Sequence, residues 1–185
     1  AAPAPAPTPT NPTGPPPDVF ISYKRDERSE VVAIARRLEA LKLRVWYDAQ
    51  MQSGTTFDAE IHTQVRSARA VLVCWSPGAV ESQWVRSEAT IGQQRGVLAA
   101  AMLKPCDLPP PFNIVHADDL TAGIGPGNPD WLRLVERVGS LVGRPGLSAF
   151  EALESNADSA AHAAWIATHK GDPLLDTAVE RLKRL

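Results

Sequence analysis

Short apolar runs alternate with amphipathic stretches along most of this chain, and the alternation constrains its fold more than any other feature. Apolar runs at 19–21, 43–47, 70–75 and 97–103, with a weaker one at 112–115, have the length of buried strands. Helical spacing of apolar residues separates them, as at Val31, Ile34, Leu38 and Leu41. Because parallel strands need crossover helices, we predict a doubly wound α/β fold with a five-stranded parallel sheet.

Two segments of different composition flank this pattern. Residues 1–17 are rich in proline and alanine and read as a linker or a leader. The domain itself is expected at residues 18–143, where a Gly-Arg-Pro-Gly sequence stops the last helix. Residues 147–185 predict a short helical pair. One helix is expected through Phe150, Leu153, Ala161 and Trp165, and the other through Leu174, Leu175, Val179 and Leu182. Such a pair is typical of partner-binding helical regions.

Charge and cysteine content exclude several classes of function. The 19 Lys and Arg residues nearly balance 21 Asp and Glu residues, so no broad positive field favours nucleic acid or anionic lipid. No apolar run is long enough to span a membrane. Two cysteines make no disulfide framework, and we therefore expect a cytoplasmic protein. The four histidines lack metal-ligand spacing, so no zinc site is predicted.

The carboxyl ends of the first and third strands carry the first candidate binding residues. In a flavodoxin-like strand order the winding direction reverses between these strands, and ligands bind there. The ends are Ser22-Tyr23-Lys24-Arg25 and Trp75-Ser76, which supply hydroxyl groups, cations and aromatic faces. Such groups suit a nucleotide. No Gly-x-Gly-x-x-Gly or P-loop motif follows the first strand, which disfavours an ordinary dehydrogenase or a P-loop enzyme.

A helix after the third strand carries Trp84 and Glu88, which are four residues apart and therefore share a helix face. Cleavage of an N-glycosidic bond passes through an oxocarbenium-like state that one carboxylate can stabilise. Nicotinamide leaves a cationic nucleotide as a neutral ring, so its departure needs no acid. Trp84 and Glu88 are thus candidates for the cleavage of such a bond.

These motifs resemble those of Toll/interleukin-1 receptor (TIR) domains over roughly residues 18–141. Asp18-Val19-Phe20-Ile21-Ser22-Tyr23 is similar to TIR box 1, and Trp84-Val85-Arg86-Ser87-Glu88 resembles the tryptophan-x-x-x-glutamate helix of TIR enzymes. The resemblance implies that NAD⁺ is the substrate, that no further cofactor is needed, that Glu88 is catalytic and that Trp84 lines the NAD⁺ pocket. It further implies nucleotide contacts from Lys24 and Arg25, a BB loop that begins at Asp48, and a turn at Ser76-Pro77-Gly78-Ala79.

The differences from animal receptor TIR domains favour a bacterial effector. The loop at residues 48–55 lacks the usual proline, and the Phe-Trp of box 3 is absent. Bacterial TIR effectors deplete NAD⁺ or form cyclised ADP-ribose in antiphage defence, which predicts an NAD⁺ glycohydrolase or ADP-ribosyl cyclase activated by homotypic TIR assembly. A sensor or regulatory protein could bind the tether or the C-terminal helices.

Less specific interpretations stay open at this point. Glu88 could be a solvated helix charge, and Trp84 could pack in the core. Lys24 and Arg25 could pair with neighbouring acids, whereas Trp75 and Ser76 could only end a strand and cap a helix. The alternative functions are a non-catalytic TIR–TIR scaffold and a mimic that disturbs host TIR signalling.

Overall fold

The predicted sheet is present and has the predicted order. The computed structural model describes residues 15–47 and 55–185, and side chains in the second range from residue 60. Within these residues one sheet has five strands in the order β2-β1-β3-β4-β5, and all of its pairings are parallel. Its strands are β1 (Val19–Ser22), β2 (Val45–Tyr47), β3 (Ala70–Trp75), β4 (Leu98–Met102) and β5 (Asp118–Asp119). This is the flavodoxin-like order.

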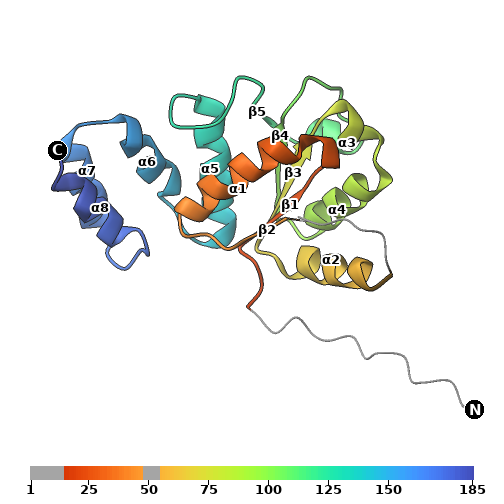
Figure 1. The fold of residues 1–185 in the computed structure, drawn as a ribbon, viewed down its shortest axis with the longest axis horizontal. Coiled ribbons are helices and arrows are strands. Elements are labelled where there is room, and N and C mark those ends of the chain that lie inside the picture. The colour runs from red at the N-terminus through yellow and green to blue at the C-terminus, as the bar shows by residue number, and fades with distance from the viewer. Residues whose placement is uncertain (1–14, 48–54) are drawn as a thin grey trace, which may run out of the picture.

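Helices cover both faces of the sheet (Figure 1). Strand side chains alternate between the faces, so Val19 and Ile21 pack on one side and Phe20 on the other. The first side carries α1 (Arg28–Ala40) and α5 (Pro129–Val142), and the second carries α2 (Thr55–Ser67), α3 (Pro77–Glu81) and α4 (Gln83–Gln94). Among the described residues, no helix has the length and apolar character needed to cross a membrane.

Local caps explain where the helices near the sheet's carboxyl edge begin. The Ser76 hydroxyl accepts a hydrogen bond from the amide of Ala79 at 3.1 Å, and Pro77 occupies the first turn of α3. Ser82 then ends α3 in an extended conformation and caps α4 through the amide of Val85 at 3.4 Å. The break at Ser82 starts a new helix, and this sets the rotation at which α4 packs against the sheet.

The position predicted for the fifth strand was wrong. Phe112–Ile114 forms a 3-10 turn, η2, in which the Phe112 ring lies 5.2 Å from that of Trp75. Strand β5 comes later, where the backbone of Asp118 pairs with Ala101. In the run at 112–115, the apolar side chain of Phe112 packs against Trp75 of β3. The edge strand β5 instead forms by backbone pairing with β4, and its two residues are both acidic. Periodicity therefore detected a buried segment and misassigned its structure.

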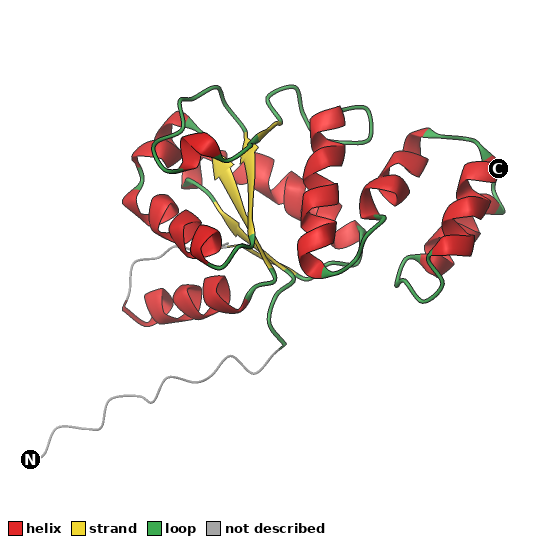
Figure 2. Cartoon of the chain, turned by 180° about the vertical axis from the view of Figure 1, so that it is seen from behind, coloured by secondary structure: helices red, strands yellow, loops and turns green. Residues whose placement is uncertain are grey.

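Three helices and a 3-10 turn follow α5. They are α6 (Leu147–Ala152), η3 (Leu153–Ser155), α7 (Ser159–Thr168) and α8 (Leu175–Leu182). The prediction of one helix from Phe150 to Trp165 was wrong, because Asp158 caps a new helix by accepting from the amide of Ala160 at 2.8 Å. Helix α8 agrees with the second predicted helix, and α7 contains only the C-terminal half of the first; Figure 2 shows α7 and α8 packed as a pair to one side of the α/β layers.

The C-terminal helices share the apolar core of α1 and α5. Leu147, Phe150 and Trp165 belong to the same buried cluster as the apolar residues of those helices. Glu151 on α6 is buried there, where it accepts from the indole N–H of Trp131 at 2.7 Å and from the guanidinium of Arg37. A buried carboxylate with two donors is well satisfied, so these contacts join α6 to both α1 and α5.

Candidate functional site

Glu88 is a buried carboxylate at the carboxyl edge of the sheet. Its α4 neighbours Val85 and Ala89 face the core, and Glu88 itself is 6% exposed. Ser22, the last residue of β1, is 1% exposed and donates its hydroxyl hydrogen to Oε2 of Glu88. A carboxylate in such surroundings needs a donor, because burial without one costs several kcal/mol, on the order of 2–7 even for neutral groups. This charge-assisted hydrogen bond joins the end of β1 to helix α4.

Trp84 lies one turn before Glu88 on α4 and is more exposed to solvent than Glu88. Its side chain is 38% exposed, which makes it one of the exposed large apolar side chains of the described chain. Helical spacing puts the indole on the same face as the carboxylate. An accessible aromatic surface therefore lies beside a carboxylate that is fixed in orientation by Ser22.

Lys24 and the turn after β3 also come together. The backbone pairs Ser22 of β1 with Val73 of β3, so the two strands end at one edge. Lys24 is half-buried, and a Cβ added to Gly78 would lie 3.3 Å from its Cγ. The lysine stem therefore crosses the first turn of α3, whose cap is Ser76. A positive charge and a helix N-terminus at the same edge suit an anionic group of a ligand.

The other predicted binding residues are placed differently. Trp75 is fully buried, and its indole N–H has no acceptor among the described residues. Tyr23 packs against the apolar cluster of α1 and α5, on the sheet face opposite to Glu88. Arg25 is exposed in the 3-10 turn η1 (Arg25–Glu27). Asp48 lies outside the described residues. Ser22, Lys24, Ser76, Trp84 and Glu88 thus form the group that the fold gathers around the switch point.

A second buried carboxylate at this edge was not predicted. Glu27 is 4% exposed and pairs with the ammonium group of Lys104 at 3.2 Å, while its Oε2 has no partner among the described residues. Burial, and to a smaller degree the charge of Glu27, raises the pKa of Cys74. This thiol is therefore protonated at neutral pH and is no nucleophile. Glu27 stands in a run of charged residues, and nothing in its local sequence marks it as buried.

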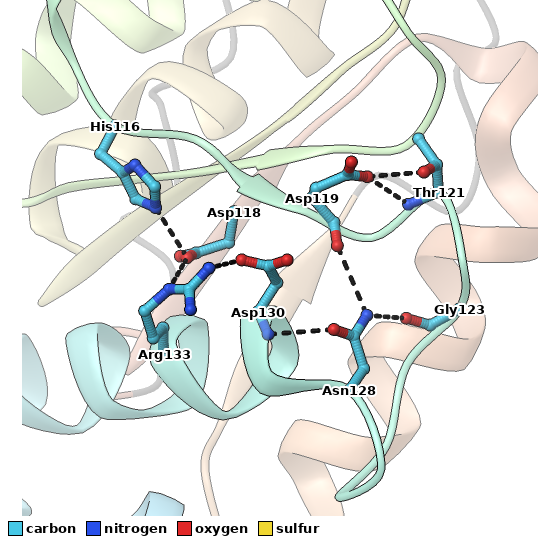
Figure 3. Close-up of polar contacts among 8 residues, drawn as sticks. All are labelled: His116, Asp118, Asp119, Thr121, Gly123, Asn128, Asp130 and Arg133. Atoms are coloured by element: carbon cyan, nitrogen blue, oxygen red, sulfur yellow. Dashed lines mark hydrogen bonds and ion pairs between the residues drawn. The ribbon is translucent and has the colours of Figure 1, made fainter.

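Another polar cluster lies at the edge strand of the sheet, between β5 and α5 (Figure 3). The ligand atoms of His116, Asp118 and Asp130 lie within 4.8 Å of one another, a spacing that could hold a metal ion. Arg133, however, pairs with both Asp118 and Asp130 and so supplies the positive charge there. We interpret the cluster as an ion-pair network that fixes the short strand β5 on α5.

Comparison with known proteins identifies the family. The family model described as the TIR domain matches residues 19–134, which is more than half of the chain. The chain belongs to the TIR domain family. The fold is similar to the crystal structure of the TIR domain of the Toll-related receptor TRR-2 from the lower metazoan Hydra magnipapillata. That similarity has a TM-score of 0.52 and 20% identity and covers 57% of this chain and 85% of the other. A search of curated proteins found no match.

Proposed function

We propose that this TIR domain is an NAD⁺ nucleosidase in which Glu88 is the catalytic residue. The observation that carries the proposal is the buried Glu88 carboxylate, held by the Ser22 hydroxyl beside the exposed indole of Trp84. A merely solvated helix charge has no need of burial or of a donor from a distant strand. The resemblance to TIR enzymes gives the same residue the same role.

The chemistry follows from the charges at this edge. The bond between ribose C1′ and the nicotinamide nitrogen breaks, and its electron pair stays with the departing ring, which becomes neutral. Glu88 stabilises the positive charge that develops on the ribose, either directly or by accepting hydrogen bonds from the ribose hydroxyls. Water then attacks C1′ and loses a proton, which gives ADP-ribose. Attack by a nucleophile of the substrate itself gives a cyclic product instead.

Other residues of the group bind the remainder of the substrate. Trp84 offers a face on which an aromatic ring of NAD⁺ stacks. Lys24, which crosses the first turn of α3, pairs with the diphosphate. Ser76 and Trp75 act indirectly, since one caps α3 and the other packs in the core beneath it. Tyr23, Arg25 and Asp48 remain proposed contacts of the nucleotide or of a neighbouring protomer.

We further propose that homotypic TIR assembly switches the enzyme on in the cytoplasm of a bacterial cell, as part of antiphage defence. Strand β2 ends at Tyr47, which pairs with Ile21 of β1, and the BB loop that follows from Asp48 lies outside the described residues. In the proposed assembly, one protomer's loop completes its neighbour's site. Activity then rises more steeply than linearly with protein concentration, because the active species contains more than one chain.

Nicotinamide release from NAD⁺ tests the proposal. The 185-residue chain is assayed by liquid chromatography both in dilute solution and immobilised on beads at high density. Glu88→Gln keeps the side-chain size but removes the charge. Glu81→Gln is the matched control, since Glu81 is an exposed glutamate at the end of α3. We expect Glu88→Gln to lower release at least 100-fold and Glu81→Gln to leave it unchanged within about twofold, since stabilisation of developing charge contributes roughly 10²–10³ in rate.

Two outcomes would contradict the proposal. Equal release by the wild type and Glu88→Gln would exclude Glu88 as the catalytic residue. Absence of release at every surface density, from protein that size-exclusion chromatography shows to be assembled, would favour the non-catalytic scaffold. Mass spectrometry of the products distinguishes linear from cyclised ADP-ribose.

A further inference from the structure

A positively charged groove lies in the C-terminal helices, outside the residues matched by the TIR family model. It has a volume of about 370 Å³ and opens between the turn before α7 and the end of α8. Its polar side chains include Arg181, Arg184, His162, Asn156 and Glu154, and its apolar lining includes Leu153. Volumes of roughly 300–1,000 Å³ are typical of sites that hold small molecules.

Arg181 is fixed in place before any ligand arrives. Its guanidinium carbon lies 4.5 Å from the centroid of the Phe150 ring, a cation–π contact that orients the side chain. Its Nη1 is buried and has no hydrogen-bond acceptor among the described residues. A buried donor without a partner costs about 1–3 kcal/mol, so a ligand acceptor that came within reach of Nη1 would be stabilised there.

The groove has an excess of positive charge. Glu154 is the acid of its lining, and its carboxylate already pairs with Arg37 from α1. Arg181 and Arg184 form no ion pair with an acidic side chain of the described residues, and the remaining negative charge of the lining is the terminal carboxylate of Leu185 in the 185-residue chain.

His162 adds a hydrogen-bonding edge to the same groove. It is 2% exposed, and its Nδ1 lies 2.9 Å from the carbonyl oxygen of Asp158, which fixes the plane of the ring. The N–H at Nδ1 donates to that carbonyl, so Nε2 is left as an acceptor for a hydroxyl group of the ligand rather than as a donor to phosphate oxygens. A buried histidine and a stacked arginine make a preorganised polar wall, unlike solvated surface charges.

We infer that this groove binds a phosphate monoester. Two guanidinium groups without an acidic side-chain partner match a doubly charged phosphate better than a singly charged carboxylate, and Arg presents N–H groups in a geometry that fits phosphate oxygens. The volume exceeds that of the phosphate alone and admits a small organic group against Leu153. The source is either a free small metabolite or a phosphorylated side chain of a partner, and the probes below separate these two.

Titrations followed by two-dimensional NMR of the ¹⁵N-labelled 185-residue chain test the inference at constant ionic strength. The probes are inorganic phosphate, ribose 5-phosphate, a phosphoserine peptide and acetate. We expect saturable shifts at residues of the groove with both phosphate esters or one of them, and weaker binding of acetate. Tighter binding of ribose 5-phosphate indicates a metabolite, and tighter binding of the peptide indicates a protein partner.

Charge-matched variants make the test specific. Arg181→Gln and Arg184→Gln remove charges from the groove, whereas Lys183→Gln removes one from an exposed residue between them that pairs with Glu180. Each arginine variant should weaken phosphate binding about tenfold or more, since hydrogen bonds to charged groups are the strong ones. Arg184 is exposed, so its variant folds even if that of Arg181 does not. Equal affinities in Arg184→Gln and Lys183→Gln, or no saturable binding of any phosphate, would overturn the inference.

Discussion

The substitution Ser22→Ala isolates the contact on which the proposed site depends. It removes the hydroxyl that donates to Glu88 but leaves the backbone of β1 and the volume of the side chain nearly unchanged. A hydrogen bond to a charged group contributes about 1.5–3 kcal/mol, and both residues are buried, so screening by water is slight. If the bond persists in the transition state, this loss corresponds to a decrease in kcat/KM of about 10- to 150-fold. Ser87→Ala, at an exposed serine of α4, should change kcat/KM by less than twofold.

A double-mutant cycle in urea unfolding measures the same contact without reference to activity. In the wild-type background, Ser22→Ala should lower the free energy of unfolding by about 1.5–3 kcal/mol. In a Glu88→Ala background the same substitution should cost less than about 0.5 kcal/mol, since no buried charge remains to be satisfied. Equal costs in the two backgrounds would refute our account of Ser22 as the donor that orients Glu88.

Two further predictions concern the C-terminal part of the chain. Gly146→Ala should destabilise the fold by at least about 1–2 kcal/mol in thermal unfolding, because Gly146 has φ of 92° and a Cβ would lie 2.0 Å from His169 Nε2. Gly127→Ala, where a Cβ meets nothing within 4 Å, is the control and should have little effect. Burial raises the pKa of Asp172, but hydrogen bonds from Arg144 and a backbone amide, with nearby positive charge, outweigh it and lower the pKa below its ordinary value. Asp172 therefore stabilises the fold above its ordinary pKa of about 4, and this contribution is lost as pH falls through the lower folded pKa; urea titrations should show a smaller acid loss in Asp172→Asn.

Sequence periodicity predicted those features that depend on local repetition. Buried parallel strands are continuous apolar runs, and their crossover helices have apolar residues at helical spacing, so the first four strands were predicted from periodicity; the flavodoxin-like order expected for such a fold is also present. The pairing of Trp84 with Glu88 on one helix face also follows from spacing alone. The exposed indole and buried carboxylate agree with a site there, although the catalytic role of Glu88 stays a prediction.

Features that depend on contacts between distant residues could not be predicted in this way. The partner of Glu88 is 66 residues away in sequence, and that of Glu27 is 77 residues away. Both contacts exist because strand ends meet at one sheet edge, which no local pattern records. The position of β5 was predicted wrongly for a related reason. Its two acidic residues form a strand by pairing with the backbone of β4, and Arg133 of α5 pairs with the charge of Asp118.

The core shared by the C-terminal helices determines how the molecule unfolds. The family match ends at residue 134, within α5, yet the buried face of that helix continues to Val142 and packs with Leu147 and Phe150. Loss of α6 would expose this surface and strip the partners from Trp131 and Arg37. The TIR domain and its C-terminal helices should therefore unfold as one cooperative unit. A ligand that binds beside α8 then raises the free energy of unfolding of the TIR domain as well, without touching α4, which carries Glu88.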